Sequence, residues 1–207
     1  MLQHEVVAKL FLIIVMQSLK RLYYHFVRWP RSHGFGIQSP SDFNFVLDVV
    51  RQRYPYYAYS ELAEIYPEDY VTRTFHQFLL RLSNMVQGQY WVSNNLKTVE
   101  LDYLRAGCNK VSLLSSHPHP DGVILDLSNL QLPSDYEKSF YHWYVDALTP
   151  NGVLVVEGIH ESDICYRFWK QIVDDTRAIT SFDIYDVGVV FFDLKKPKNH
   201  YNITFRL

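Results

Sequence analysis

The chain has 207 residues, 48% of them hydrophobic, and a net charge of −2 at pH 7. This length suits one α/β domain with a small appendage, and the hydrophobic content is enough to bury a full core. The nearly balanced charge gives no general reason to expect nucleic acid as a partner. Two cysteines, Cys108 and Cys165, are far apart and lack metal-ligand spacing. They indicate free thiols, so we expect a cytoplasmic protein.

An apolar run, Leu10–Met16, lies near the N-terminus. Glu5 and Lys9 precede it, no small-residue cleavage site follows it, and Lys20 closes it well short of the roughly 20 residues that span a bilayer. We therefore expect no integral membrane segment. Helical spacing of the apolar residues predicts one long amphipathic helix over residues 5–28. Its apolar face is expected to pack on the domain or to form a homodimer with a second copy; attachment to a membrane surface is the alternative.

The next part of the chain is rich in turn-forming and aromatic residues. Residues 29–41 contain several glycines and prolines and are predicted to form a loop. Ser39-Pro40 within it is typical of a helix start, with serine as the N-cap, and predicts a helix to about Arg53. Tyr54–Tyr59 is interpreted as an aromatic connector. Residues 1–60 are thus expected to form an N-terminal helical extension.

Residues 61–207 have the alternating pattern of an α/β domain. Apolar residues at helical spacing predict helices over 69–86, 96–105, 134–148 and 162–174. Short β-branched or aromatic runs predict strands at 90–93, 110–115, 122–127, 152–157, 182–185, 187–193 and 201–206. The last strands follow one another without helices, which predicts antiparallel closing strands on a parallel sheet.

Two of the predicted strands each carry one acidic residue at the end. Gly122–Leu127 contains Asp126, and Gly152–Glu157 ends in Glu157. In open α/β sheets, ligands bind outside the carboxyl ends of the strands, so both acids are expected to face the same crevice. His160 follows the second strand and is a candidate general base. As a lone loop histidine it also fits a packing role.

Four sets of residues carry a family likeness: Gly36–Pro40 (GIQSP); Tyr56–Glu61 (YYAYSE); Val123–Asp126 with Gly152–His160 (GVLVVEGIH); and Gly188–Phe192 with His200–Phe205. In this order they resemble the class I S-adenosylmethionine-dependent methyltransferases, specifically a bacterial O-methyltransferase-like group. That group has the motif GIHSP, a YYAYEE segment, and fourth and fifth strands that often read FID and DDIH. The likeness extends from about residue 34 to the end of the chain.

The resemblance implies a Rossmann-like methyltransferase sheet, mostly parallel with antiparallel closing strands. It also implies S-adenosyl-L-methionine as cofactor and a small-molecule hydroxyl as substrate. Asp126, Glu157 and His160 stand at the family's catalytic positions. In metal-dependent members, carboxylates at these strand ends hold a divalent cation that orients the hydroxyl and lowers its pKa. Here Gly158 replaces the second acid of DDIH, so no metal is expected.

The cofactor-binding half of the sequence departs from the family. Its first strand normally ends in an acid and a glycine-rich turn, E-x-G-x-x-x-G, because the backbone must approach the cofactor closely. Tyr90–Lys97 contains neither glycine nor acid. The ribose-binding carboxylate after the second strand is replaced by Ser115. Ser93, Asn94, Asn95 and Ser115 are the residues that stand where the cofactor would bind.

Residues 91–126 are also too few for all the family's elements, which predicts a sheet shortened by one edge strand. The link 116–121 must then cross to the next strand in about six residues, a reach of at most roughly 20 Å. It contains His117, His119 and Asp121, which permit a metal site but are explained equally well by a short polar connector. These departures leave a second hypothesis: a degenerate, non-catalytic homologue that serves as an interaction or dimerisation module.

Overall fold

The computed structural model describes the backbone of residues 2–127 and 134–205, and the side chains of residues 16, 18–127 and 141–205. Its helices are α1 (Leu2–Ser32), α2 (Pro40–Asn44), the π-helix η1 (Phe45–Val50), α3 (Tyr57–Ile65), α4 (Tyr70–Val86), α5 (Thr98–Gly107), α6 (Ser134–Ala147) and α7 (Asp163–Asp174). Its strands are β1 (Tyr90–Ser93), β2 (Ser112–Leu114), β3 (Gly122–Asp126), β4 (Val153–Glu157), β5 (Thr180–Asp183), β6 (Val187–Phe191) and β7 (Asn199–Asn202).

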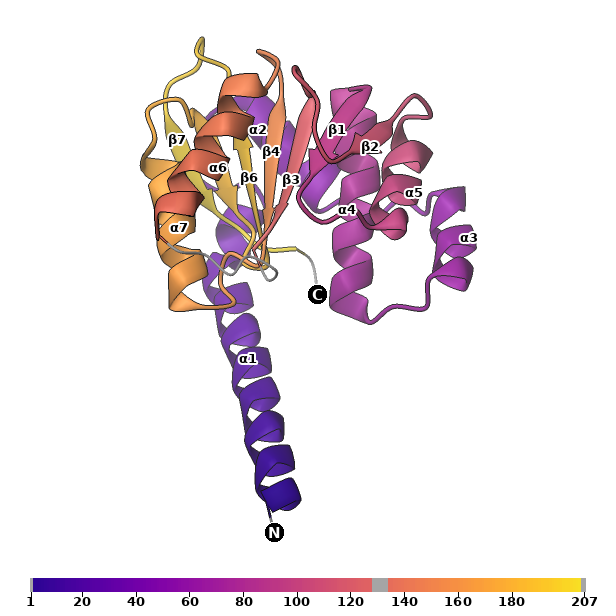
Figure 1. Ribbon diagram of the computed structural model, residues 1–207, viewed down its shortest axis with the longest axis vertical. Coiled ribbons are helices and arrows are strands. Elements are labelled where there is room, and N and C mark those ends of the chain that lie inside the picture. The colour runs from indigo at the N-terminus through magenta and orange to yellow at the C-terminus, as the bar shows by residue number, and fades with distance from the viewer. Residues whose placement is uncertain (1, 128–133, 206–207) are drawn as a thin grey trace.

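The seven strands form one sheet in the order β2-β1-β3-β4-β6-β5-β7 (Figure 1). β1 pairs in parallel with β2 and β3, and β3 pairs in parallel with β4. β6 runs antiparallel to both of its neighbours, β4 and β5. The expected Rossmann-like methyltransferase sheet is confirmed. Among the strands of the described residues, β2 alone lies beyond β1, as expected for a sheet that is shortened by one edge strand.

The closing strands differ from the prediction in their bounds, since β5 starts two residues before the predicted 182–185 and β6 ends two residues before 193. β7 spans Asn199–Asn202, starting before the predicted residues 201–206, and it runs parallel to β5. The reversal in β6 explains this direction. β6 ends opposite the start of β5, at the pair Thr180 and Phe191, so the chain must turn back there. β7 then runs antiparallel to β6 and therefore parallel to β5.

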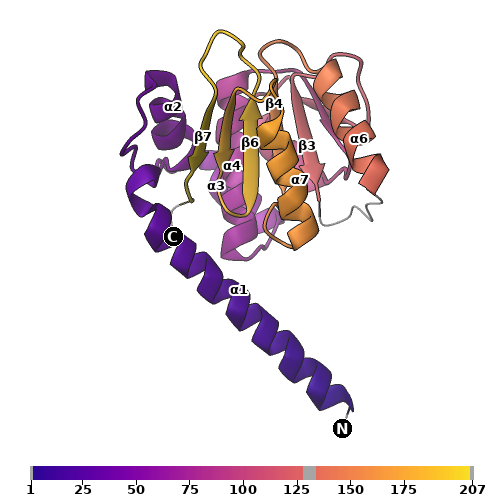
Figure 2. The same ribbon diagram turned by 90° about the vertical axis from the view of Figure 1, so that its left-hand side faces the viewer.

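Helices cover both faces of the sheet (Figure 2). α6 and α7 pack on one face, where Trp169 of α7 and alternate strand residues such as Val123 and Leu125 belong to the same core. η1, α4 and α5 pack on the other face, where Phe78 of α4 meets Ile124. Because successive strand side chains point to opposite faces, the buried strands supply both cores, and they read as continuous apolar runs.

The short link between β2 and β3 crosses beside β1. β2 has only three residues, so Leu113 and Gly122 both lie opposite Trp91 on the two sides of β1. Asp121 fixes the end of this link: its Oδ2 accepts hydrogen bonds from the backbone N–H groups of Gln89 at 2.8 Å and Tyr90 at 3.0 Å. His117 stacks on the Tyr90 ring, with centroids 4.0 Å apart. The polar link is therefore fixed to the start of β1.

The N-terminal extension is more helical than the sequence indicates. α1 continues through Pro30 to Ser32, so the predicted helix over residues 5–28 is too short at both ends. Ser39 caps α2 as expected, accepting the N–H of Asp42 at 3.4 Å. The aromatic stretch predicted as a connector enters α3 at Tyr57. None of the helices among the described residues is long and apolar enough to cross a membrane.

Candidate functional site

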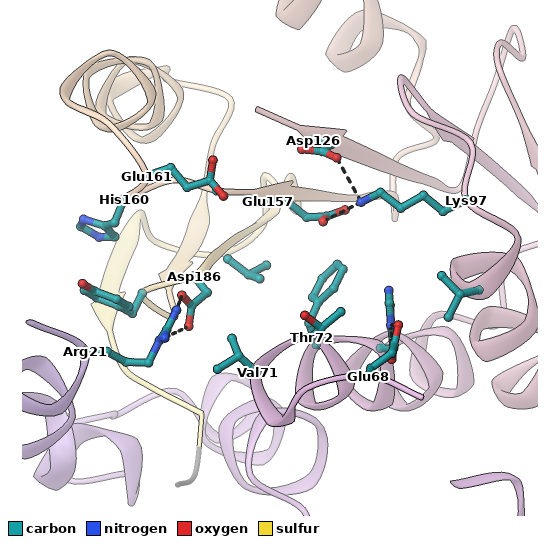
Figure 3. Close-up of a pocket in the computed structure, with 16 residues that line it drawn as sticks. Arg21, Glu68, Val71, Thr72, Lys97, Asp126, Glu157, His160, Glu161 and Asp186 are labelled. Carbon is teal, nitrogen blue, oxygen red and sulfur yellow. Dashed lines mark hydrogen bonds and ion pairs between the residues drawn. The ribbon is translucent and has the colours of Figure 1, made fainter. Parts of the chain in front are cut away.

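A cleft of about 610 Å³ lies at the carboxyl ends of β3 and β4, between the sheet and the first turns of α4 (Figure 3). This is where ligands bind in open α/β sheets, and the volume is that of a small-molecule site. Seven of its sixteen lining residues are charged: Arg21, Glu68, Lys97, Asp126, Glu157, Glu161 and Asp186. The two acid-ended strands thus do face one crevice.

Lys97 lies at the centre of the acidic end of the cleft. It follows β1, at the N-cap position of α5, and its side chain extends between the two strand ends (Figure 3). Its Nζ is 3.0 Å from Asp126 Oδ2, 3.0 Å from Glu157 Oε2 and 2.9 Å from Glu100 Oε1. Glu100 is completely buried in the first turn of α5. We call these four residues the Lys97 cluster: one ammonium among three carboxyl groups.

The excess of carboxyl groups changes their protonation. Burial raises the pKa of Glu157 to about 8, with a further increase from Glu100 and an opposing effect from Lys97. Burial also raises the pKa of Glu100, although Lys97 opposes it. Protonation of Glu157 near neutral pH reduces the negative charge that a single ammonium must balance. The Lys97 cluster therefore contains a carboxyl group that titrates near physiological pH.

The segment after β1 is tied to the end of β3 by its own side chains. Asn94 Nδ2 donates to the carbonyl of Asp126 at 2.9 Å, and the Asp126 N–H donates to Asn94 Oδ1 at 2.8 Å. Asn95 Nδ2 donates to Asp126 Oδ2 at 3.0 Å. Ser93 Oγ accepts the Asn95 N–H at 3.1 Å. Ser115 is exposed after β2 and lies outside the residues that line the cleft.

His160 belongs to a second cluster of polar side chains, around Asp183. Its Nε2 is 2.8 Å from Asp183 Oδ2, at the end of β5, and its ring stacks on Tyr185. Arg28 of α1 donates from Nη1 to Asp183 Oδ1 at 2.6 Å. Burial alone would raise the pKa of Asp183, but the bonds from His160 and Arg28 lower it to about 2. We call Arg28, Asp183 and His160 the Asp183 cluster; it joins α1 to the sheet.

Two further contacts between a basic and an acidic side chain line the walls of the cleft. Arg21 of α1 donates two hydrogen bonds to Asp186, from Nη2 to Oδ1 at 2.6 Å and from Nε to Oδ2 at 3.2 Å. On the opposite wall, His76 Nδ1 lies 2.8 Å from Glu68 Oε1. Glu161 differs from these residues: among the described residues, no hydrogen bond or ion pair holds its carboxylate. Burial raises its pKa, and the charges of Asp126 and Asp186 add to that increase.

The structure brings some of the candidate residues together and separates others. Asp126 and Glu157 share Lys97, whereas His160 lies further along the cleft against Asp183. Sequence reasoning missed Lys97; the available signal was a lysine three residues before Glu100 at a helix start. Among the described side chains, no group of three His, Cys, Asp or Glu residues is placed to hold a metal ion. Asp121 instead binds the β1 backbone.

Comparison with known proteins gives a distant structural likeness. No family model matches the sequence, and no curated protein matches it significantly. Among solved structures, cofactor-bound Rv0187 from MTB has a TM-score of 0.44 at 12% identity, over 66% of this chain and 88% of that one. The O-methyltransferase from Bacillus cereus in complex with SAH has a TM-score of 0.43 at 12% identity, over 73% and 97%.

A methyltransferase from Geobacter sulfurreducens has a TM-score of 0.38 at 12% identity, over 74% of this chain and 96% of that one. At such TM-scores the likeness does not identify the fold by itself. The assignment to the Rossmann-like methyltransferase class rests on the strand order and on the single reversed strand β6.

Proposed function

We propose that this chain is a non-catalytic member of the methyltransferase fold, and that its cleft binds a small, positively charged molecule. The Lys97 cluster is the observation that carries the first part. The carboxyl groups of Asp126 and Glu157 stand at the strand ends where a substrate or a cation would be expected. The chain's own ammonium already lies 3.0 Å from each of them.

The segment after β1 supports the loss of the cofactor site. A glycine-rich turn leaves space for the cofactor next to the backbone. Here the side chains of Asn94 and Asn95 bridge that segment to Asp126. Ser115 stands after β2, where the family has the acid that holds the ribose, and it lies outside the cleft lining. These residues do not fit S-adenosyl-L-methionine in the manner that the resemblance implies.

The charge of the cleft supports a cationic ligand. Its lining contains five carboxyl residues, Glu68, Asp126, Glu157, Glu161 and Asp186, but only two Lys or Arg residues. An excess of one sign of charge in a cleft concentrates ligands of the opposite sign. Figure 3 shows Glu161 projecting from the loop after β4 towards the open space. We infer that Glu161 contacts the ligand's positive group, since its carboxylate is not committed to an ion pair.

A thermal-shift and calorimetric series tests the ligand class. The full chain would be titrated with n-butylammonium, choline and agmatine, and with butyrate and n-butanol as anionic and neutral probes. We expect binding by at least one cation and by neither control probe. Glu161→Gln should weaken that binding about tenfold. Glu64→Gln, an exposed glutamate of α3 outside the cleft lining, is the matched control and should leave it unchanged. Equal binding of butyrate would contradict the proposal.

O-methylation of a small-molecule hydroxyl is the second candidate. One observation favours it: a carboxyl group with a pKa of about 8, such as that of Glu157, is suited to accept a proton near neutral pH. Incubation with methyl-labelled S-adenosyl-L-methionine and catechol measures this activity directly. We expect no label transfer. Transfer that is lost in Glu157→Gln would establish this second candidate and reject the non-catalytic function.

A further inference from the structure

The outer face of α1 is apolar over its whole described length. Met16, Leu19, Leu22, Tyr23, Phe26, Val27 and Trp29 are all exposed; for example, Leu19 is 59%, Tyr23 64% and Phe26 68% exposed. Single exposed apolar residues are ordinary on protein surfaces, but a contiguous stripe of this kind marks a contact with another apolar phase.

The opposite face of the same helix carries the contacts with the body. Arg21, His25, Arg28 and Ser32 follow one another at helical spacing on that face. Arg21 and Arg28 bind Asp186 and Asp183, and Ser32 accepts the N–H of Thr204 at 2.9 Å. The apolar stripe therefore points away from the body. In Figure 2 the body lies entirely on one side of α1, and the other side is open along the whole helix.

A flat surface can thus contact α1 without obstruction from the body. The N-terminal half of α1 extends beyond the body (Figure 1), and its sequence there includes the run Leu10–Met16, LFLIIVM. At 1.5 Å per residue, the 31-residue helix is about 46 Å long. Tyr23, Phe26 and Trp29 lie in the half nearer the body, and such aromatic side chains favour a membrane–water interface.

The charges around the stripe fit an anionic surface. Lys20 and Arg31 are exposed and lie eleven residues apart, which is about three helical turns, so they share one flank of the stripe. The sequence places a third basic residue, Lys9, eleven positions before Lys20. Residues 1–32 contain five Lys or Arg and one acid, whereas the rest of the chain contains fifteen Lys or Arg and twenty-one acids. An anionic surface would attract the helix and repel the body.

We propose that α1 lies flat in the interface of an anionic lipid membrane, with its apolar stripe in the acyl region and Lys20 and Arg31 at the headgroups. A second copy fits the stripe less well. In a two-fold antiparallel pair, the flanks with Lys20 and Arg31 would lie on the same side, like charge beside like charge. A parallel pair would align the two helix dipoles unfavourably.

Co-sedimentation of the full chain with vesicles tests the proposal. We expect binding to vesicles of phosphatidylglycerol and phosphatidylcholine at physiological salt, and much weaker binding to phosphatidylcholine alone. The double variant Leu19→Glu/Phe26→Glu should lose binding at least tenfold. Leu194→Glu, a change at a 76% exposed leucine in the turn before β7, is the matched control and should bind as the unaltered chain does. Lys20→Gln should weaken binding about fivefold.

Two further measurements keep the test decisive. Vesicle binding should shift tryptophan emission to the blue, and Trp29→Phe should remove most of that shift while preserving binding. Circular dichroism checks that each variant is folded. Unchanged binding by Leu19→Glu/Phe26→Glu would overturn the proposal. The proposal would also be overturned if the unaltered chain did not bind anionic vesicles but sedimented as a dimer, and if Leu19→Glu/Phe26→Glu sedimented as a monomer. The stripe would then contact a second copy.

Discussion

The Lys97 cluster has more carboxyl groups than basic groups, whereas the Asp183 cluster has more basic groups than carboxyl groups. In the Lys97 cluster, one ammonium serves three carboxyl groups, and burial and mutual repulsion raise the pKa of Glu157 to about 8. In the Asp183 cluster, one carboxylate is held by Arg28 and His160, and its pKa falls to about 2 despite its burial. Both lie at carboxyl ends of strands in one sheet.

The difference shows that the number of basic groups around a buried carboxyl group decides whether that group stays ionised. Asp183 has enough partners to remain ionised, so its cluster is a permanent connection between α1 and the sheet. Glu157 has too few, so its proton is exchangeable and its cluster responds to pH and to ligands. The Asp183 cluster therefore has a structural role, and the Lys97 cluster contains Glu157, the carboxyl group of the cleft whose charge changes with pH.

The largest effect is expected from Arg28→Met. This change leaves Asp183, 3% exposed on its side chain, buried without its main counter-charge. Breaking a buried pair from one side costs about 3–5 kcal/mol. Urea denaturation measures the loss, and Arg28→Met/Asp183→Asn should recover part of it. Arg21→Met breaks a pair whose side chains are 32% and 28% exposed, and it should cost about 1 kcal/mol or less. Equal losses in the two single variants would contradict the distinction.

Lys97→Met should have a smaller effect, and one that depends on pH. Lys97 is 30% exposed, and the carboxyl groups left behind can take up protons. We expect a loss of about 2 kcal/mol at pH 8, less than the loss from Arg28→Met, and a smaller loss at pH 5, where Glu157 is protonated. Denaturation at the two pH values measures both losses. A loss that does not change with pH would show that the carboxyl groups of the Lys97 cluster do not take up protons between pH 8 and pH 5.

The pH dependence of stability gives the third comparison. The folded pKa of Glu157, about 8, lies above its ordinary value of 4.5. Its contribution to stability is therefore complete below about pH 4.5 and is lost as the pH rises through 8. Glu157→Gln cannot lose a proton, so its unfolding free energy relative to the unaltered chain should rise between pH 5 and pH 8. If the unfolding free energies of Glu157→Gln and of the unaltered chain changed equally with pH, the raised pKa of Glu157 would be contradicted.

Asp183 is expected to respond in the opposite direction. Its folded pKa lies below the ordinary value of 3.8, so its contribution is complete above that pH and is lost as the pH falls through about 2. The unaltered chain should lose additional unfolding free energy in acid as Asp183 takes up a proton. Asp183→Asn and Arg28→Met/Asp183→Asn lack that carboxylate, so both should begin to unfold at the same acid pH. The two clusters would then be distinguished by opposite pH slopes within one protein.

The sequence predicted the sheet well, because its strands are short apolar runs whose acids mark their carboxyl ends. Asp126 and Glu157 were placed in one crevice from that pattern alone. Lys97 was not foreseen, since a lysine at a helix start is ordinarily solvated. Its role depends on three carboxyl groups from separate segments, and contacts of that kind arise only in the folded chain. Spacing could not reveal that Arg28 reaches Asp183 across 155 positions.

The N-terminal region was the least predictable part. Pro30 indicates the end of a helix because it has no N–H for the carbonyl of Phe26, and α1 ends only two residues later, at Ser32. α3 begins inside an aromatic stretch that has no clear helix-start residue, since Tyr56 makes no side-chain cap. Tertiary contacts decide these elements: Arg81 of α4 donates to the carbonyl of Val49 and to the Tyr59 hydroxyl.

Calorimetric titration of the full chain with S-adenosylhomocysteine tests the central claim most directly. The claim is that Asn94 and Asn95 bind Asp126, and that Lys97 lies between Asp126 and Glu157, in place of the cofactor site that the resemblance implies. It predicts no heat of binding up to millimolar ligand. Saturable binding at micromolar concentration, weakened by substitution of Asn95, would show that the cofactor site is intact and would contradict the non-catalytic function.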